Sequence, residues 1–198
     1  TGELASLMVG REVDLTVEKI AGKPGEVVLK VDGISVLDDR EQRAVNQVGF
    51  EVRAGEILAI AGVQGNGQTE LAEAILGLRP LHTDSGDIVV SGESVRGKSV
   101  RHVLEVGVGY VPEDRKKDGL ISEFTIAENL MLNGSFGKPF AKGLGINFAS
   151  RNSLADQRIQ EFDVRTPSAE TLAGKLSGGN QQKVVLAREL SREVKLLI

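Results

Sequence analysis

A glycine-rich loop at residues 62–69 has the residue types and spacing of a site that binds phosphate. Its sequence, GVQGNGQT, matches the pattern G-x-x-x-x-G-K-[ST] at every position except the lysine, where the chain carries Gln68. Glycines leave the backbone N–H groups of such a loop accessible, so these groups point at phosphate oxygens from the N-terminus of the following helix. The hydroxyl of Thr69 is the group that would bind Mg²⁺. We therefore expect nucleotide contacts from a set of neighbouring residues: Gly62, Gln64, Gly65, Asn66, Gly67, Gln68, Thr69 and Glu70.

Gln68 takes the place of the positive charge that such a loop normally offers to the outer phosphates. A charged hydrogen bond exceeds a neutral one by about 1 kcal/mol, so binding would weaken by about tenfold. Loss of an electrostatic stabiliser in a transition state lowers the rate by a factor on the order of 10²–10³. The sequence therefore predicts a loop that still binds nucleotide but turns it over poorly. A glycine turn without a ligand is the alternative interpretation.

A second motif, LSGGNQQK at residues 176–183, places small residues directly before a helix. Such a turn also binds anions, because the first N–H groups of the helix are free and its dipole favours negative charge. An ordinary helix start is the alternative. The eight residues together, downstream of a phosphate-binding loop, are far more specific than an ordinary helix start. We therefore expect nucleotide contacts from Ser177, Gly178, Gly179 and Asn180.

The segments around the glycine loop have the order of strand, loop and helix that a phosphate site requires. Residues 57–61, ILAIA, are a continuous apolar run, typical of a strand buried on both faces of a parallel sheet. Residues 69–76 have helical spacing of apolar side chains, and Gly77 ends that helix. Capping-box spacing at Thr125 and Ser153 predicts two further helix starts. The remaining predicted elements are strands at 27–31, 48–52, 87–90, 108–111 and 194–198, and helices at 126–132, 154–162 and 180–190.

The composition excludes some classes of function. Of the 198 residues, 40% are hydrophobic and only 4% are aromatic, so the chain can bury a substantial, mostly aliphatic core. The net charge of −4 argues against a general nucleic-acid-binding surface, which needs a basic face. The chain has no cysteine, which excludes disulfides and thiolate metal sites. Its apolar runs are far shorter than the roughly 18 residues of a membrane helix, so we expect any work at a membrane to go through partners.

Residues 27–198 resemble the nucleotide-binding domain of ABC transporters. Residues 110–120, YVPEDRKKDGL, are similar to a segment that importers for simple sugars and nucleosides carry in the second ATPase half of a duplicated subunit. Residues 62–71 and 161–167 look closest to the nucleoside branch. The resemblance implies an α/β fold of the P-loop NTPase class. It would be an ABC-type ATPase core with a parallel sheet, an antiparallel β subdomain and a helical subdomain at about residues 120–180.

The resemblance also implies a domain organisation. Residues 1–26 would connect to an upstream nucleotide-binding half, because residues 7–12 are similar to the end of such a half. A native flexible tail is the alternative. Residues 27–198 would be a truncated, incomplete ABC ATPase domain, since the carboxylates expected after the strand at 194–198 are missing. ABC ATPases also carry a switch histidine after these carboxylates. His82 and His102 cannot take its place, because both precede the second motif. We expect the isolated chain to hydrolyse no ATP.

In ABC ATPases the motif that corresponds to residues 176–183 is called the signature. Each ATP lies between the glycine loop of one half and the signature of the other. The resemblance therefore implies that Ser177, Gly178 and Gly179 contact the γ-phosphate held by the upstream half. The glycine loop of this chain would form a second, weakened site for ATP and Mg²⁺. Glu113 occupies the position where most ABC ATPases have a glutamine, and it would reach Mg²⁺ together with Thr69 and assist catalysis. An aromatic residue that would stack on adenine is absent from residues 38–43.

The function implied is that of an ABC importer for sugars or nucleosides, in which ATP binding and hydrolysis drive solute uptake. The implied partners are the upstream half, transmembrane permease subunits and, indirectly, an extracytoplasmic solute-binding protein, with no nucleic acid. The implied location is the cytoplasmic face of the plasma membrane. A non-hydrolytic regulatory module is the alternative. The sequence leaves the role of two segments undecided. Residues 115–117 approach phosphates, contact the permease or form a solvated turn. The Phe-containing loop 134–149 faces the permease or packs locally.

Overall fold

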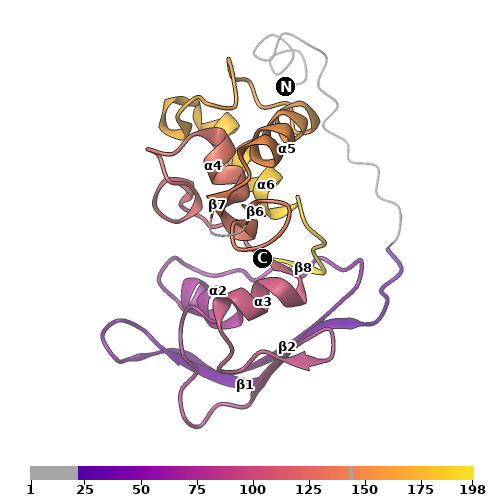
Figure 1. Cartoon of the computed structure of the whole chain (residues 1–198). Helices are drawn as coiled ribbons and strands as arrows, with labels where there is room; N and C mark the ends of the chain where they lie inside the picture. The colour runs from indigo at the N-terminus through magenta and orange to yellow at the C-terminus, as the bar shows by residue number, and fades with distance from the viewer. Residues whose placement is uncertain (1–21, 143–144) are drawn as a thin grey trace, which may run out of the picture.

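The computed structural model describes residues 22–142 and 145–198, so most of the predicted connector at 1–26 lies outside the described residues. The described residues form two parts (Figure 1). One contains an antiparallel sheet with helices packed on it, and the other contains three helices around a core of their own. The glycine loop belongs to the first part and the second motif to the other.

The antiparallel sheet has four strands in the order β2-β1-β3-β4. Their bounds are Val27–Leu37 (β1), Arg43–Arg53 (β2), Asp87–Val90 (β3) and Glu93–Ser94 (β4). Ile34 of β1 and Ile88 of β3 are almost completely buried in one core with apolar side chains of α2 (Gln68–Ile75) and α3 (Val100–Val106). The predicted strands at 27–31, 48–52 and 87–90 and the helix at 69–76 are therefore confirmed.

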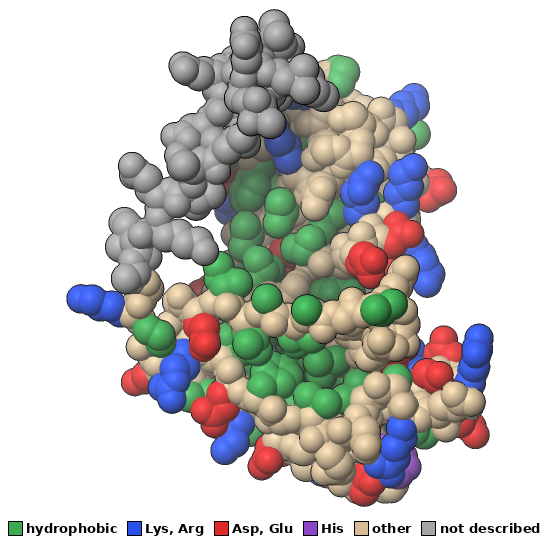
Figure 2. Space-filling model, turned by 180° about the vertical axis from the view of Figure 1, so that it is seen from behind, with side chains coloured by type: hydrophobic (Ala, Val, Ile, Leu, Met, Phe, Trp, Pro, Cys, Tyr) green, Lys and Arg blue, Asp and Glu red, His purple; other side chains and the backbone are tan. Residues whose placement is uncertain are grey.

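The predicted buried strand at residues 57–61 is wrong. The structure has no strand there, and Ile57 is 96% exposed and Ile60 53% exposed. Cavities of about 420 and 500 Å³ border this segment, both lined in part by Phe50 and Leu58. Figure 2 shows a hollowed face on which hydrophobic side chains gather. A strand buried on both faces needs hydrogen-bonded neighbours, and none of the described residues pairs with this segment.

The parallel sheet consists of one short pair within the described residues. β5 (Val108–Gly109) and β8 (Leu196–Leu197) run parallel and are hydrogen-bonded to each other. They confirm the predicted strands at 108–111 and 194–198, although both are shorter than predicted. Leu196 is buried and Leu197 is 47% exposed, so β8 is buried on one face only.

The helical part is built from α4 (Ile126–Met131), α5 (Phe148–Glu161) and α6 (Gly178–Glu189). Their apolar side chains form a separate core that includes Ile126, Ala155 and Val184. Within residues 22–142 and 145–198, no helix is both long and apolar enough to cross a membrane. Short elements connect these helices: η1 (Arg115–Gly119), η2 (Leu132–Gly134), β6 (Ala141–Lys142), β7 (Gly145–Ile146) and η3 (Ala173–Lys175).

One of the two predicted helix starts is confirmed. Thr125 begins α4 with a complete capping box: its hydroxyl accepts a hydrogen bond from the N–H of Glu128 at 3.2 Å, and the Glu128 carboxylate accepts one from the N–H of Thr125 at 2.7 Å. The predicted start at 154 is wrong, since Ser153 lies inside α5. Asn147 caps this helix instead, because its side chain accepts a hydrogen bond from the N–H of Ser150 at 3.2 Å.

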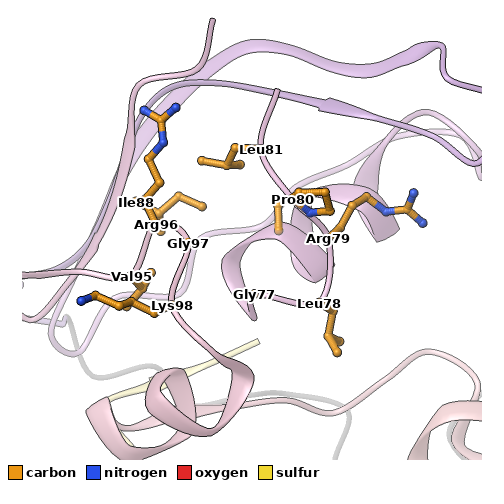
Figure 3. A pocket seen from close by; sticks show the side chains of 11 residues that line it. Gly77, Leu78, Arg79, Pro80, Leu81, Ile88, Val95, Arg96, Gly97 and Lys98 are labelled. Carbon is orange, nitrogen blue, oxygen red and sulfur yellow. The ribbon is translucent and has the colours of Figure 1, made fainter. Parts of the chain in front are cut away.

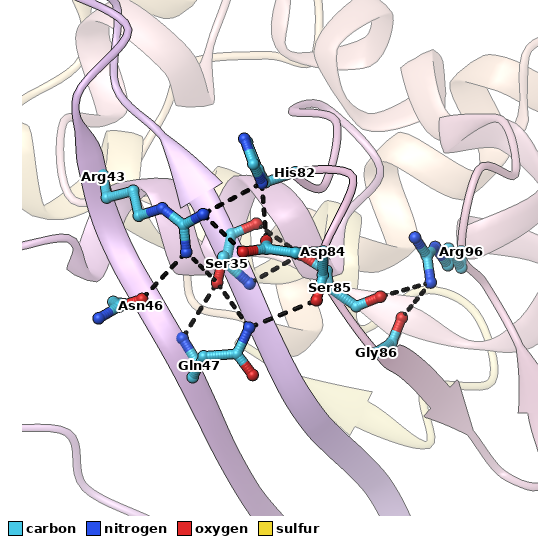
Figure 4. A network of polar contacts seen from close by, with 9 residues as sticks. All are labelled: Ser35, Arg43, Asn46, Gln47, His82, Asp84, Ser85, Gly86 and Arg96. Carbon is cyan, nitrogen blue, oxygen red and sulfur yellow. Dashed lines mark hydrogen bonds and ion pairs between the residues drawn. The ribbon is translucent and has the colours of Figure 1, made fainter.

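A polar network holds the loop before β3 to one end of β1 and β2 (Figure 4). The hydroxyl of Ser85 accepts a hydrogen bond from the N–H of Ser35 at 2.8 Å and donates one to the Ser35 carbonyl oxygen at 2.9 Å. Arg43 of β2 forms an ion pair with Asp84 at 2.5 Å. The hydrogen bond from Arg43, and then that from His82, hold the pKa of the Asp84 carboxyl below its usual value. The network fixes the start of β2, which the glycine loop approaches.

Candidate nucleotide-binding site

The glycine loop turns tightly into α2. Gly65 and Gly67 have φ angles of 86° and 97°, a region that glycine enters without strain. A Cβ on Gly67 would lie under 3.0 Å from the carbonyl oxygen of Ala44, so no side chain fits between the loop and β2. A Cβ on Gly65 would meet nothing within 4 Å, so the loop is open on that side. Open backbone at the N-terminus of α2 is suited to a phosphate group.

The side chain of Gln68 folds back over the loop. Its Nε2 donates a hydrogen bond to the carbonyl oxygen of Val63 at 3.4 Å and lies where a Cβ on Gly62 would stand. The amide therefore fills part of the space that the loop encloses, and it brings no charge. At 3.4 Å the bond is long and weak, so an entering phosphate displaces it at little cost.

The other candidate residues of the loop leave it accessible. Gln64, Asn66 and Thr69 are exposed, and Glu70 is half-buried in the first turn of α2. A carboxylate in the first turn complements the helix dipole, but it competes with an anionic ligand for the same N–H groups. The cavity of about 500 Å³ described above reaches the loop at Asn66, Gly67 and Gln68.

Glu113 lies on an exposed turn after β5. Thr69 and Glu113 are not part of a metal-binding cluster in the structure, because the described residues contain no group of three or more His, Cys, Asp or Glu that could hold a metal ion. Burial raises the pKa of Tyr110, and the carboxylates of Asp118, Glu73 and Glu113 raise this pKa further. Tyr110 therefore lies within electrostatic reach of both Glu113 and α2, the helix that carries Glu73.

The second motif forms the start of α6. Ser177 is the N-cap residue, but its hydroxyl makes no capping bond to the helix backbone and accepts instead from Nδ2 of Asn180 at 3.0 Å. Ser177 and Gly179 are exposed, and a Cβ on Gly179 would meet nothing within 4 Å. The start of this twelve-residue helix is therefore open at Gly179, at the positive end of the helix dipole.

Asn180 has a structural part in this turn. Its Oδ1 accepts a hydrogen bond from the N–H of Arg165 at 2.9 Å, while its amide nitrogen donates to Ser177. Both ends of the side chain are engaged. The geometry therefore favours Ser177 and Gly179 over Asn180 as the groups that a ligand would reach.

A buried carboxylate, which the sequence analysis missed, fastens the far end of α6. Glu189 is 2% exposed. Its Oε1 accepts hydrogen bonds from Asn133 at 2.8 Å and from Nε of Arg188 at 2.9 Å, and its Oε2 accepts one from the N–H of Tyr110 at 3.3 Å. Arg188 also donates to the carbonyl oxygen of Gly119 at 2.8 Å. These bonds join α6 to η1, to η2 and to the residue that follows β5. No signal in the sequence separates Glu189 from the solvated carboxylates that many helix ends carry.

Comparison with known proteins identifies the family. Residues 45–198 match the family model described as ABC transporter, and this range contains both motifs. The chain belongs to the ABC transporter family. This match, together with the antiparallel, parallel and helical parts of the structure, confirms the predicted α/β fold of an ABC-type P-loop ATPase core.

Three curated relatives of this ABC domain are import proteins. The guanosine import ATP-binding protein NupO of Bacillus subtilis (strain 168) is 47% identical over 196 residues, which are 99% of this chain and 38% of that protein. The nucleoside import ATP-binding protein NupA of Lactococcus lactis subsp. cremoris is 43% identical over the same shares. The ribose import ATP-binding protein RbsA 3 of Rubrobacter xylanophilus is 41% identical over 98% of this chain and 37% of that protein. The chain thus spans less than two fifths of the length of these relatives.

Two solved structures share the fold of this ABC domain. A dimeric ATP-binding cassette in a post-hydrolysis state, bound to ADP and Pi, has a TM-score of 0.68 at 20% identity, and the match covers 85% of this chain and 72% of that chain. A second ATP-binding cassette of an ABC transporter has a TM-score of 0.66 at 21% identity, with 87% and 68% covered. Both likenesses extend over most of the antiparallel and helical parts described above.

The Phe-containing loop of this ABC domain is partly exposed. Phe140 is 6% exposed and packs locally, whereas Phe136 is 44% exposed and Phe148 60% exposed. The guanidinium of Arg101, from α3, lies 3.8 Å from the centre of the Phe136 ring. Local packing and an accessible apolar surface, the two interpretations left open by the sequence, therefore apply to different Phe residues.

A hollow of about 360 Å³ lies beyond the C-terminal end of α2 and has no part in the candidate site (Figure 3). Arg79 and Arg96 line it, but both are engaged. Arg79 forms an ion pair with Glu73 at 2.6 Å, and Arg96 donates to the carbonyl oxygen of Ser85 at 2.7 Å. The residues of the two motifs do not line this hollow.

Proposed function

We propose that this chain is a nucleotide-binding half of an ABC importer subunit and that it couples ATP binding and hydrolysis to solute uptake. The observation that carries the proposal is the start of α6, where Ser177 and Gly179 leave an exposed, positively polarised helix end while the other end is held by buried Glu189. Two of the relatives, at 47% and 43% identity, are named for guanosine and nucleosides, and one at 41% is named for ribose. We therefore favour nucleosides as the solute class and keep sugars as the second choice.

The two motifs divide the work between two ATP molecules. The signature at residues 177–179 completes the pocket of an ATP held by another nucleotide-binding half, which we place upstream in the same subunit. Its free N–H groups and the Ser177 hydroxyl donate to the outer phosphate. The glycine loop of this chain holds the second ATP. It offers backbone N–H groups but only the neutral amide of Gln68, so it binds nucleotide and turns it over slowly.

ATP and Mg²⁺ fit the open face of the glycine loop. Gly65 leaves that face unobstructed, the hydroxyl of exposed Thr69 is the group that would hold Mg²⁺, and we assign Glu113 to the same ion, directly or through water. When bound, Mg²⁺ would neutralise phosphate charge. Glu70 complements the α2 dipole. The residues of this chain supply orientation and hydrogen bonds, and the charge that a lysine would add at position 68 is missing.

The partners follow from the importer hypothesis. They are the upstream half, the permease subunits and, through the permease, a solute-binding protein outside the membrane. We place the subunit on the cytoplasmic face of the plasma membrane, held there by the permease. Exposed Phe136 and Phe148 are the apolar groups that we assign to the permease contact. The acidic net charge of −4 argues against nucleic acid as a partner.

A second candidate function is a regulatory module that binds nucleotide without hydrolysis, and the Gln68 amide inside the loop favours it for this half. The substitution Gln68→Lys separates the two functions. We propose to measure ATP hydrolysis by the full-length subunit, assembled with its permease, after the glycine loop of the other half has been disabled. Val63→Lys is the matched control, since it adds the same charge to the same loop at a side chain that is 74% exposed and outside the expected set of nucleotide contacts.

If Gln68 limits this half, Gln68→Lys raises the hydrolysis rate by about 10²-fold and Val63→Lys leaves it unchanged. An equal rate in both variants means that the missing lysine is not what limits this half. For the 198-residue chain alone we expect no hydrolysis, because its signature has no second half to serve and its own glycine loop lacks the lysine charge. Steady hydrolysis by the purified chain, above that of a preparation of the Gly67→Ala variant, would overturn this expectation.

A further inference from the structure

Arg115 links the turn that carries Glu113 to the signature. It opens η1, and its guanidinium lies against Gly178 at the start of α6. A Cβ on Gly178 would lie under 3.0 Å from Nη2 of Arg115, so the missing side chain at position 178 is what lets the guanidinium approach. Arg115 is half-buried, so of the alternatives left open for residues 115–117 a solvated turn does not describe this residue.

The η1 turn is capped at its start and hydrogen-bonded to α6 at its end. At its start, the carboxylate of Asp114 accepts hydrogen bonds from the N–H groups of residues 116 and 117 at 2.9 and 3.2 Å. At its end, Arg188 of α6 donates to the carbonyl oxygen of Gly119 at 2.8 Å. Arg115 is therefore held by a formed turn that is hydrogen-bonded to α6.

The electrostatics of this contact do not favour folding. Arg115 places a positive charge at the positive end of the α6 dipole, an arrangement that is unfavourable in the absence of an anion. Among the described residues Arg115 forms no ion pair, and its buried Nε–H has no hydrogen-bond partner. A buried donor without a partner is costly. The contact of the guanidinium with Gly178 is therefore not explained by an ion pair or a hydrogen bond among the described residues.

We propose that Arg115 is a positioning residue that fixes the signature turn at 177–179 relative to the turn carrying Glu113. The signature would then respond to the state of this half's own nucleotide site. The inference rests on the function proposed above for the signature, and it adds a physical connection between the two ATP sites. Lys116 and Lys117 carry the same charge in the same turn, but both are exposed and have no such contact.

The first test measures ATP hydrolysis by the full-length subunit assembled with its permease. Arg115→Ala lowers kcat by about 10²-fold with little change in KM, since misplacing a contact group by about 1 Å has an effect of this size. Arg115→Lys recovers part of the rate, and the matched control Lys117→Ala stays at the wild-type rate. If Arg115→Ala equals Lys117→Ala, the inference is wrong. A wild-type subunit without hydrolysis would instead count against the proposed function.

The second test does not depend on hydrolysis and uses backbone amide NMR of the 198-residue chain. The substitution Glu113→Gln should shift the amide signals of Gly178 and Gly179 when Arg115 is present. In the Arg115→Ala background the same substitution should leave both signals in place, because the connection is broken. Equal shifts in the two backgrounds, or no shift in either, would overturn the inference whatever the full-length subunit does.

Discussion

The two motif regions of this ABC domain differ in how firmly the rest of the chain holds them. The signature begins a helix whose far end is fixed by Glu189, which is 2% exposed and hydrogen-bonded to two other elements. The glycine loop follows a segment in which Ile57 is 96% exposed, and it meets β2 closely at Gly67. Both motifs form the turn that their glycines require. How each turn is anchored depends on residues far away in the sequence.

The largest expected effect is at the anchor of the signature helix. Glu189→Ala leaves the buried guanidinium of Arg188 without its carboxylate, and breaking a buried ion pair in this way costs about 3–5 kcal/mol in the free energy of unfolding. Urea unfolding followed by circular dichroism measures the change. Glu193→Ala, four residues on and exposed, is the control and should stay within about 0.5 kcal/mol of wild type. Similar losses in the two variants would mean that α6 is not anchored at Glu189.

The anchor of the glycine loop should be weaker but still measurable. Gly67→Ala places a Cβ against the carbonyl oxygen of Ala44 at a φ of 97°, and we expect a loss of about 3 kcal/mol in the free energy of unfolding. Gly65→Ala tests the same kind of φ, 86°, without any neighbour within 4 Å, so its loss should be about 1 kcal/mol. Equal losses would show that the loop does not press on β2.

Two helix starts give a smaller contrast. Thr125 uses its hydroxyl in a capping box, so Thr125→Ala should destabilise the fold by about 1 kcal/mol. Ser177 makes no capping bond, so Ser177→Ala should change stability by less than about 0.5 kcal/mol. Thermal unfolding of the two variants side by side measures the difference. A loss at Ser177 as large as that at Thr125 would mean that its hydroxyl is a structural cap and not a free ligand group.

The smallest expected effect is a pH dependence in the same capping box. The hydrogen bonds from Thr125 hold the pKa of the Glu128 carboxyl below its usual value. Since this pKa is lower in the folded state, the added stability is present at neutral pH and is lost as the pH falls from about 5 towards 3. Glu128→Gln keeps the box but removes the charge, so it should flatten the acid limb of the stability curve by less than about 1 kcal/mol. Glu123→Gln, at an exposed position, should leave the curve unchanged.

Local sequence patterns predicted most of the elements that depend on local contacts. The strands of the antiparallel sheet, α2 and the start of α4 follow from alternation, helical spacing and a capping box. The strand at 57–61 could not be decided in this way, because an apolar run becomes a buried strand only where neighbours pair with it. At α5 the Asn147 cap prevailed over the capping-box spacing at Ser153, since a box inside a helix has no free N–H groups to satisfy.

The candidate site was predictable to a similar depth. The two glycine-containing motifs and the missing positive charge at position 68 follow from the sequence. The folded-back amide of Gln68, the engagement of Asn180 by Arg165 and the contact of Arg115 with Gly178 are pairings across the fold, and no spacing rule contains them. Glu189 belongs to the same class, because its partners are Tyr110 directly after β5, Asn133 of η2 and the neighbouring Arg188 of α6.

The division of labour between the two motifs is tested most directly by ATP hydrolysis of the full-length subunit carrying either Ser177→Ala or Gln68→Ala. We expect Ser177→Ala to lower the hydrolysis rate by about 10²-fold, since its hydroxyl serves the active pocket, and Gln68→Ala to change the rate by less than about twofold. If Gln68→Ala lowers the rate as much as Ser177→Ala, the glycine loop of this chain is itself an active site, and the account is contradicted.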